Sequence, residues 1–294
     1  MDMVRPATLA EALQAKADRP ELLPVAGGTD VMVGVNFDRL RPPGLLDLRL
    51  LPGLTDWSIQ PGDTIRLGAG VPYARIIDEL GDLLPGLAMA SRTVGSPQIR
   101  HAGTVGGNLG TASPAGDAHP PLLAGRAAVE IASVRGTRTV PVTEFYTGVK
   151  RNVLAPDELV AAVLVPVAPG PQQFAKIGTR NAMVIAVCSF GLELDVAGRR
   201  VGAAIGSAAP TPRVAAEAED YAGDELADRW ESRAELPEAV RRRFGELVAA
   251  AASPVDDVRG SAAYRRHALA VLAARTLGWA WADYRSGWQA RRAS

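Results

Sequence analysis

The chain has 294 residues, of which 47% are hydrophobic and 22% charged, a composition typical of globular proteins with a sizeable core. Basic and acidic residues number 32 each, so no chain-wide field favours nucleic acid or an anionic membrane as a partner. The N-terminus does not resemble a signal peptide, and no apolar stretch reaches the roughly 18 residues of a membrane span. We therefore expect a cytoplasmic protein.

Cysteine and histidine usage argues against a metal site within this chain. The single cysteine, Cys188, follows an apolar run and can form neither an internal disulfide nor a thiolate cage, so we expect it in the core. His101, His119 and His267 show no ligand spacing. We predict no bound metal, and we interpret His101 and His119 as hydrogen-bonded structural residues.

The first third of the chain is predicted to alternate short helices and strands. Thr8 and Glu11 form a capping-box pattern that predicts a helix from Leu9 to Ala17, with a strand over 22–26. Residues 31–35 are expected to continue as a buried segment. Pro-Gly turns then separate short strands as far as residue 70, and helices are predicted over 73–80 and within 84–95.

The remainder is predicted as a loop, a strand-rich part and a final α+β part. Residues 101–117 read as a glycine-rich loop, followed by a helix over 121–128. Strands return from 128 to 166, with a hairpin turn at Arg135-Gly136. After the Pro-Gly-Pro boundary at 169–171, strands precede two long helical regions, roughly 213–251 with breaks and 260–285.

Two glycine-rich segments could hold a diphosphate. Glycine lets the main chain approach phosphate oxygens, which backbone N–H groups bind well. Residues 26–30, AGGTD, offer consecutive N–H groups, and residues 104–111, TVGGNLGT, offer the same chemistry with hydroxyl and amide donors. Each segment alone is more often a plain chain reversal. Asp117 favours a nucleotide site over a plain turn, because a carboxylate beside a phosphate site can accept from a ribose or ribityl hydroxyl.

The common nucleotide motifs are excluded. A Walker A site needs a Gly-Lys pair, which the chain lacks, and the glycine spacing at 107–110 does not fit a Rossmann fingerprint. A dinucleotide site here is therefore of another kind.

Three longer motifs carry a family resemblance. AGGTD near the N-terminus, VGSPQIRHAGTVGGNLGTASPAGDAHPPLLA at 94–124 and FAKIGTRNAMVIA at 174–186 resemble the FAD-binding medium subunit of the molybdenum hydroxylases, the xanthine dehydrogenase and carbon monoxide dehydrogenase family. Residues 257–277 are similar to the C-terminal helix of that subunit. The resemblance implies an α+β chain with an FAD-binding fold of the vanillyl-alcohol-oxidase (PCMH) type. It divides into two α/β subdomains, 1–55 and 56–170, and a C-terminal α+β subdomain, 171–290.

The resemblance also implies a set of cofactor-binding residues and no catalytic side chain. Backbone donors to the pyrophosphate would come from Val25, Ala26, Gly27, Gly28, Thr29, Asp30 and Val31. The second segment would contribute Thr104, Gly106, Gly107, Asn108 and Thr111, with Gly110 close to the isoalloxazine. Asp117 would accept from ribose hydroxyls, Val160 would lie against the adenine, and Lys176 would approach the carbonyl edge of the ring, where a cation stabilises reduced flavin.

The implied function is electron transfer within a larger enzyme. One cysteine cannot hold a four-thiolate iron–sulfur cluster, so the molybdenum cofactor and [2Fe–2S] clusters would sit in a large and a small partner subunit, in a dimer of heterotrimers. FAD would pass electrons to NAD or another acceptor. Many relatives carry an acid after the position of Arg180, whereas this chain reads NAMVIA, which leaves the acceptor open.

Two other functions remain open at this point. A free-standing FAD-dependent oxidase or dehydrogenase would act on its own substrate, although aromatic residues, at 5%, are few for such a pocket. A nucleotide-binding or assembly protein without redox activity would use the glycine segments only as scaffold, which Asp117 and the doubled segment argue against. The hydroxylated substrate is not encoded here, because its pocket would lie in the molybdenum subunit.

Overall fold

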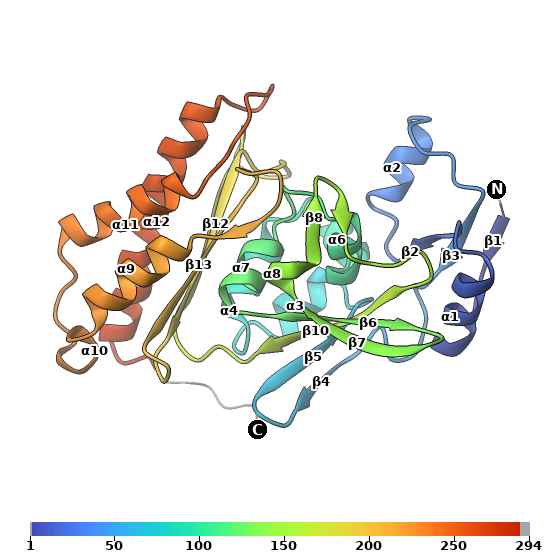
Figure 1. Cartoon of the computed structure of the whole chain (residues 1–294), viewed down its shortest axis with the longest axis horizontal. Helices are drawn as coiled ribbons and strands as arrows, with labels where there is room; N and C mark the ends of the chain where they lie inside the picture. Colours follow the sequence, from blue (N-terminus) through green and yellow to red (C-terminus); the bar gives the residue numbers. More distant parts are fainter. Residues whose placement is uncertain (1, 289–294) are drawn as a thin grey trace.

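The computed structural model describes residues 2–288, so the last residues of the predicted C-terminal part, 289 and 290, lie outside the described chain. Three sheets follow one another along the sequence (Figure 1). The first is parallel, with the order β1-β3-β2, and its strands are Asp2–Val4, Gly44–Asp47 and Leu23–Val25. The helices of this region are α1, Leu9–Asp18, and α2, Val31–Asn36.

The second sheet is antiparallel and has the order β4-β5-β10-β6-β7. Its strands in that order are Trp57–Gln60, Thr64–Gly68, Leu159–Pro166, Ala128–Ser133 and Gly136–Pro141. Its short helices are α3 Tyr73–Glu79, α4 Pro85–Arg92, α5 Pro97–Ala102, α6 Val105–Thr111, α7 His119–Ala124 and α8 Val142–Phe145. A separate hairpin is formed by β8, Tyr146–Gly148, and β9, Arg151–Asn152.

The third sheet is antiparallel in chain order and consists of β11 Gln172–Ile177, β12 Cys188–Asp195, β13 Arg200–Gly206 and β14 Arg213–Val214. The helices α9 Ala216–Leu226, α10 Arg229–Ser232, α11 Glu238–Ala250 and α12 Ala262–Arg285 follow it. Figure 1 shows α9, α11 and α12 on one side of this sheet and α7 on the other. The predicted α+β class and the C-terminal α+β part are thus confirmed.

Local sequence signals account for several element ends. Thr8 Oγ1 accepts from Glu11 N at 3.2 Å, which confirms the predicted N-cap of α1. The other half of the capping box differs, because Glu11 Oε2 accepts from Ala7 N, at 2.8 Å, and not from Thr8 N. The hairpin β6–β7 turns at residues 134–135, one residue before the prediction. Cys188 is fully buried, as expected for a core residue, and burial raises the pKa of its thiol to about 12.

Three local predictions were wrong. Residues 101–117 are not one loop, because Thr104 caps a helix, α6, that contains the paired glycines. Residues 31–35 form the exposed helix α2 rather than a buried segment, so their apolar pattern did not report burial. The helix expected over 121–128 begins at His119 and ends at Ala124, and Ala128 begins β6.

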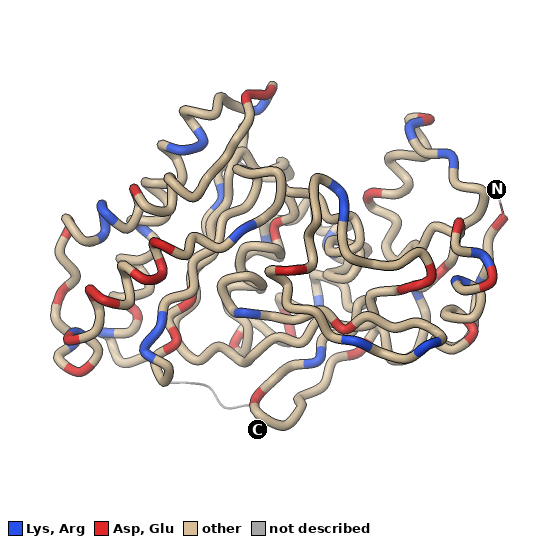
Figure 2. The backbone as a smooth tube through the Cα atoms, in the orientation of Figure 1, with Lys and Arg blue, Asp and Glu red and all other residues tan. Residues whose placement is uncertain are grey.

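Charges of both signs are spread along most elements (Figure 2), whereas α9 carries acidic residues only, namely Glu217, Glu219, Asp220, Asp224 and Glu225. Within residues 2–288, no helix has the length and apolarity needed to cross a bilayer.

Candidate functional site

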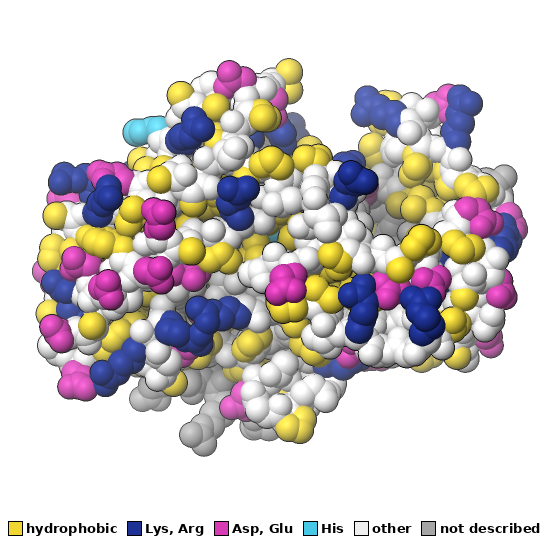
Figure 3. All heavy atoms as spheres, viewed as in Figure 1, with side chains coloured by type: hydrophobic (Ala, Val, Ile, Leu, Met, Phe, Trp, Pro, Cys, Tyr) yellow, Lys and Arg dark blue, Asp and Glu magenta, His cyan; other side chains and the backbone are white. Residues whose placement is uncertain are grey.

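A cavity of about 780 Å³ lies between the turn after β2, helix α6 and β10, a volume suited to a cofactor. Figure 3 shows the molecular surface hollowed beside the arm that carries α2. The predicted site residues that line the cavity are Ala26, Gly27, Gly28, Thr29, Asp30, Val31, Thr104, Gly106, Gly107, Asn108, Gly110, Thr111 and Val160. Val25 instead lines a smaller pocket of about 170 Å³ that shares Ala26, Gly27 and Gly28 with the cavity, and Asp117 and Lys176 are not among the residues that line the cavity.

The turn after β2 offers unpaired backbone donors. The N–H groups of Gly27, Gly28, Thr29 and Asp30 have no hydrogen-bond acceptor among residues 2–288. Gly28 has φ of 71°, a left-handed conformation that favours glycine. Unpaired N–H groups at the edge of a cavity are costly unless water or a ligand accepts from them. This turn therefore provides an anion-binding row of donors.

The two glycine segments meet at Gly27. A Cβ added there would overlap the carbonyl oxygen of Ala102, at the end of α5. Gly27 thus allows the first turn to pack directly against the chain that leads into α6. Glycine is needed at this position because a side chain would prevent the close approach of the two backbone segments.

Backbone N–H groups of the second segment already donate to acceptors within the protein. Gly106 N donates to Ala69 O at 3.0 Å, Gly107 N donates to Thr104 Oγ1 at 3.0 Å, and Asn108 N donates to Thr104 O at 3.0 Å. These three N–H groups are therefore occupied, in contrast to those of the first turn. What α6 presents is bare backbone, because a Cβ on Gly110 would meet nothing within 4 Å and one on Gly107 only Thr104 Oγ1.

Two buried polar atoms on the lining residues lack partners. Tyr73 Oη and Asn108 Oδ1 make no hydrogen bond among the described residues, although both are inaccessible to solvent. Buried polar groups are normally paired, so such atoms mark places where a ligand or water would bind. The free donors, the bare glycine backbone and the Tyr73 hydroxyl fit a polar, phosphate-bearing cofactor, whereas the Asn108 oxygen, which only accepts, needs a donor as its partner.

The opposite end of the cavity is apolar. The lining side chains there are Leu23, Leu48, Leu54, Leu154, Pro156, Leu159 and Val160. A buried cation, Lys16, borders this end, and its Nζ donates to Pro20 O at 2.5 Å and Leu22 O at 2.7 Å. Burial lowers the pKa of Lys16. Sequence reasoning missed Lys16, because a lysine in the last turn of a helix usually faces solvent.

Asp117 and Lys176 form a buried ion pair with each other. Lys176 Nζ lies 2.6 Å from Asp117 Oδ2, which also accepts from Thr93 Oγ1 at 3.0 Å. Burial raises the pKa of Asp117, and the charge of Lys176 opposes that rise. The second oxygen, Asp117 Oδ1, has no partner among the described residues. Residues 59 positions apart were predicted to act separately, but the structure joins them.

His119 is fully buried as well. Its Nδ1 lies 2.6 Å from Tyr146 Oη, and the two rings meet edge to face. Burial lowers the pKa of His119 to about 3, so the ring is neutral near pH 7. His101, by contrast, is exposed and bonds Pro97 O through Nδ1. Both histidines are hydrogen-bonded, as the sequence predicted.

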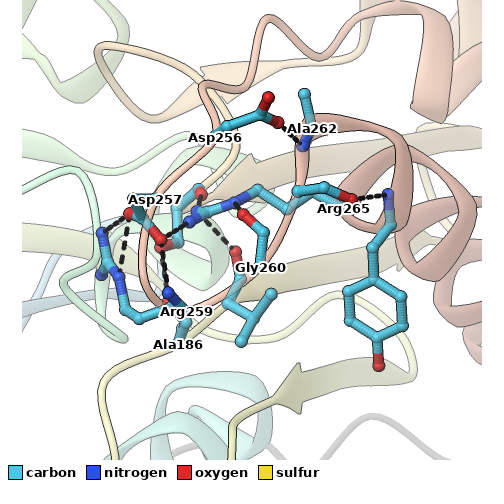
Figure 4. Close-up of polar contacts among 11 residues, drawn as sticks. Ala186, Asp256, Asp257, Arg259, Gly260, Ala262 and Arg265 are labelled. Atoms are coloured by element: carbon cyan, nitrogen blue, oxygen red, sulfur yellow. Dashed lines mark hydrogen bonds and ion pairs between the residues drawn. The ribbon is translucent and has the colours of Figure 1, made fainter.

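The loop between β11 and β12 reaches the cavity through Ile185 and is anchored from α12. Figure 4 shows Arg265, at the start of α12, beside Asp257 and the chain at Ala186. Arg265 Nη1 donates to Val187 O at 2.9 Å and to Ser207 O at 2.6 Å, while its Nη2 lies 2.5 Å from Asp257 Oδ1. Hydrogen bonds from arginines, chiefly Arg259, hold the pKa of Asp257 well below its usual range. The clamp fixes where the loop re-enters the sheet.

Comparison with known proteins places this geometry in a family. Residues 1–168 match the family described as the FAD binding domain in molybdopterin dehydrogenase, and residues 173–280 match the CO dehydrogenase flavoprotein C-terminal domain. The chain is 30% identical over 282 residues to the xanthine dehydrogenase FAD-binding subunit of Escherichia coli O157:H7, with 93% of each chain covered.

Two further proteins show the same likeness. The nicotine 6-hydroxylase medium subunit of Paenarthrobacter nicotinovorans is 32% identical over 282 residues, which cover 92% of this chain and 94% of that protein. The solved structure of a Cu,Mo-CO dehydrogenase in its cyanide-inactivated form superimposes with a TM-score of 0.86 at 26% identity and covers 96% of this chain and 98% of that one. The chain therefore belongs to the family of FAD-binding subunits of molybdopterin-dependent dehydrogenases and hydroxylases, and it is an oxidoreductase subunit.

Proposed function

We propose that this chain holds FAD in the 780 Å³ cavity and serves as the electron-output subunit of a molybdenum hydroxylase. The observation that carries the proposal is the row of unpaired N–H groups at Gly27 to Asp30, which faces the bare glycine backbone of α6 across the cavity. Bound FAD supplies the redox chemistry by which electrons from [2Fe–2S] clusters of a partner would reach NAD or another acceptor.

The first turn would hold the diphosphate. Residues 25–31 contribute backbone donors, of which those of Gly27 to Asp30 are free in the structure. Across the cavity, Thr104, Thr111 and the amide of Asn108 would supply side-chain contacts, since the backbone donors of Gly106 and Gly107 are occupied. The phosphate contacts would thus be unequal, with backbone on one side and side chains on the other.

The two ends of the cofactor would lie in different surroundings. Val160 and its apolar neighbours suit the adenine, and the bare Cα of Gly110 leaves room for the isoalloxazine. Of the two Asp117 oxygens, which are buried behind the cavity wall, Oδ1 is the one that would accept a sugar hydroxyl, because Oδ2 is taken by Lys176 and Thr93. Lys176 would bring positive charge towards the flavin end. The Asp117 carboxylate partly neutralises that charge.

The partners are proposed from the family. Relatives are named as subunits or medium chains, and we infer a large molybdenum-cofactor subunit and a small iron–sulfur subunit, assembled as a dimer of heterotrimers in the cytoplasm. Of the described residues, no group of three or more His, Cys, Asp or Glu side chains could hold a metal ion. The metal centres would therefore be supplied by the partner subunits.

Affinity purification of the tagged chain from its native host tests this function. The bound material is analysed for partner chains, flavin, iron and molybdenum, and reduction of NAD is measured anaerobically. We expect FAD together with near-stoichiometric iron and molybdenum from two further chains. Isolation of this chain alone, with turnover of an organic substrate at its own flavin, would instead establish a free-standing flavin enzyme.

A further inference from the structure

The ammonium group of Lys16 is buried at the apolar end of the cavity and forms no ion pair among residues 2–288. Lys16 is 7% exposed. The two acids whose charges act on it, Glu21 and Asp157, form their ion pairs with Arg19 and Arg135 instead. A buried charge is costly unless neighbouring groups stabilise it. The hydrogen bonds of Lys16 Nζ therefore determine what this charge can do.

Two of the three N–H donors of Lys16 are assigned. Nζ donates to Pro20 O at 2.5 Å and to Leu22 O at 2.7 Å. A lysine ammonium has three N–H donors, and within the described chain Nζ has no third acceptor. Because Lys16 and Pro20 both line the cavity, the hydrogen bond between them lies at the cavity wall. One donor is thus left for water or for a ligand that enters the cavity.

The position of Lys16 assigns this donor to one end of the cofactor. Figure 1 shows α1, which carries Lys16, at the end of the molecule opposite the third sheet. Lys176, which would approach the flavin ring, lies on β11 of that sheet. The adenine would therefore extend towards α1. The other charged residue that lines this end, Glu158, is already bound by Arg138 and leaves Lys16 as the charged donor there.

The chemistry of this end matches a purine base. The faces of adenine are apolar and suit the surrounding leucines, while N1, N3 and N7 at the ring edge are hydrogen-bond acceptors. A base that enters the cavity displaces water, so it must replace the hydrogen bond that water would make. Adenine does so if one ring nitrogen accepts from Lys16 Nζ.

We propose that Lys16 donates its third N–H to a ring nitrogen of adenine and thereby makes the apolar end of the cavity selective for FAD over FMN, which lacks adenine. The carbonyl oxygens of Pro20 and Leu22 hold the ammonium in place. This inference rests on the proposed binding of FAD and adds the residue that recognises its base. A purely structural Lys16 would end its role at the two carbonyls and would not distinguish the two flavins.

Nitrogen-15 NMR of the lysine side chains tests the contact in the unmodified chain. The chain has only three lysines, Lys16, Lys150 and Lys176, so Lys16 is assigned by elimination from Lys150→Arg and Lys176→Arg. No substitution of Lys16 is needed. We expect its Nζ signal to shift when the flavin-stripped chain is saturated with FAD and to stay in place with FMN. An Nζ signal that FAD leaves unchanged would overturn the inference.

FAD analogues identify the accepting atom. In three analogues, a C–H group replaces N1, N3 or N7 of the adenine. One of them should bind the wild-type chain about tenfold more weakly than FAD, as for one lost hydrogen bond to a charged donor. That analogue and FAD should bind Lys16→Met equally well, because the donor is absent. If all three analogues bind the wild type as tightly as FAD does, Lys16 does not contact the base.

Flavin affinities of the variants separate recognition from a loss of structure. Lys16→Met should bind FAD about tenfold more weakly and FMN as the wild type does. Arg19→Met is the matched control, since Arg19 caps the same helix end but is exposed and does not line the cavity. It should bind both flavins normally. An equal loss of FAD and FMN affinity in Lys16→Met would show a structural role instead.

The outcomes also separate this inference from the proposed function. If the wild-type chain binds no FAD, the proposed function fails. If it binds FAD while the Lys16 signal and the three analogues show no difference, only the recognition of adenine by Lys16 fails.

Discussion

At the scale of single residues, buried charges of this chain are held by backbone carbonyls as well as by opposite charges. Arg265 has 2% of its side chain exposed and joins Val187, just before β12, and Ser207, just after β13, to Asp257. Such a group is costly to remove, because its removal leaves several buried acceptors without donors. No pattern in the sequence indicated this role, since Arg265 is one of many arginines in a helical segment.

Arg265→Met tests the clamp. We expect the free energy of unfolding to fall by about 2–4 kcal/mol, because the methionine fills the space but leaves the two carbonyl oxygens unpaired. Urea unfolding followed by circular dichroism measures the change. Arg266→Met, at the adjacent exposed position of α12, is the control and should change stability by less than about 0.5 kcal/mol. Equal effects at the two positions would contradict the assigned role.

At the scale of elements, the two glycine segments differ in structure and in the groups that they present to the cavity. The turn after β2 has free N–H groups, whereas α6 is a capped helix that presents bare backbone. Composition predicted that both segments approach a ligand, but it could not separate loop from helix. The paired glycines of 106–107 are helical because Thr104 caps α6, which is a local signal present in the sequence, and because Gly106 N donates to Ala69 O, which depends on tertiary structure.

Gly110→Ala tests the claim that α6 faces the cofactor. A Cβ at this position meets no protein atom within 4 Å, so the protein should fold with unchanged or slightly higher stability. FAD binding should weaken at least tenfold if the cofactor passes close to this Cα. Gly223→Ala is the matched control, because Gly223 is also helical and unobstructed but lies in α9, off the cavity. Unchanged FAD affinity in Gly110→Ala would place the cofactor elsewhere.

At the scale of the whole molecule, the third sheet docks on the FAD-binding part through buried polar contacts. Gln172 links Gly86 N, at 2.8 Å, to the carboxylate of Glu193 on β12. The ion pair of Lys176 with Asp117 lies in the same interface. The sequence predicted the order of the parts and the Pro-Gly-Pro break between them. The sequence could not predict which residues contact one another across this interface, because they are distant in the chain and carry no local pattern.

Glu193→Gln tests the energetics of that interface. Burial raises the pKa of Glu193 to about 7, from an ordinary value near 4.5, so the folded state disfavours the ionised carboxylate. The wild type should lose stability as the pH rises from 4.5 to 7, whereas the variant has no proton to lose. We expect Glu193→Gln to be more stable by roughly 2–3 kcal/mol at pH 8 and equal at pH 4.5. The exposed variant Glu231→Gln should show no such pH dependence.

The direct test of the central claim is flavin uptake by the purified full-length chain. The chain is stripped of flavin, titrated separately with FAD, FMN and riboflavin, and the bound flavin is counted from its visible absorbance after heat release. We expect one FAD per chain, with weaker binding of FMN and riboflavin, because the free N–H groups at Gly27 to Asp30 suit a diphosphate and the apolar end of the cavity suits adenine. A colourless chain that takes up no FAD, or one that binds riboflavin as tightly as FAD, would contradict this expectation.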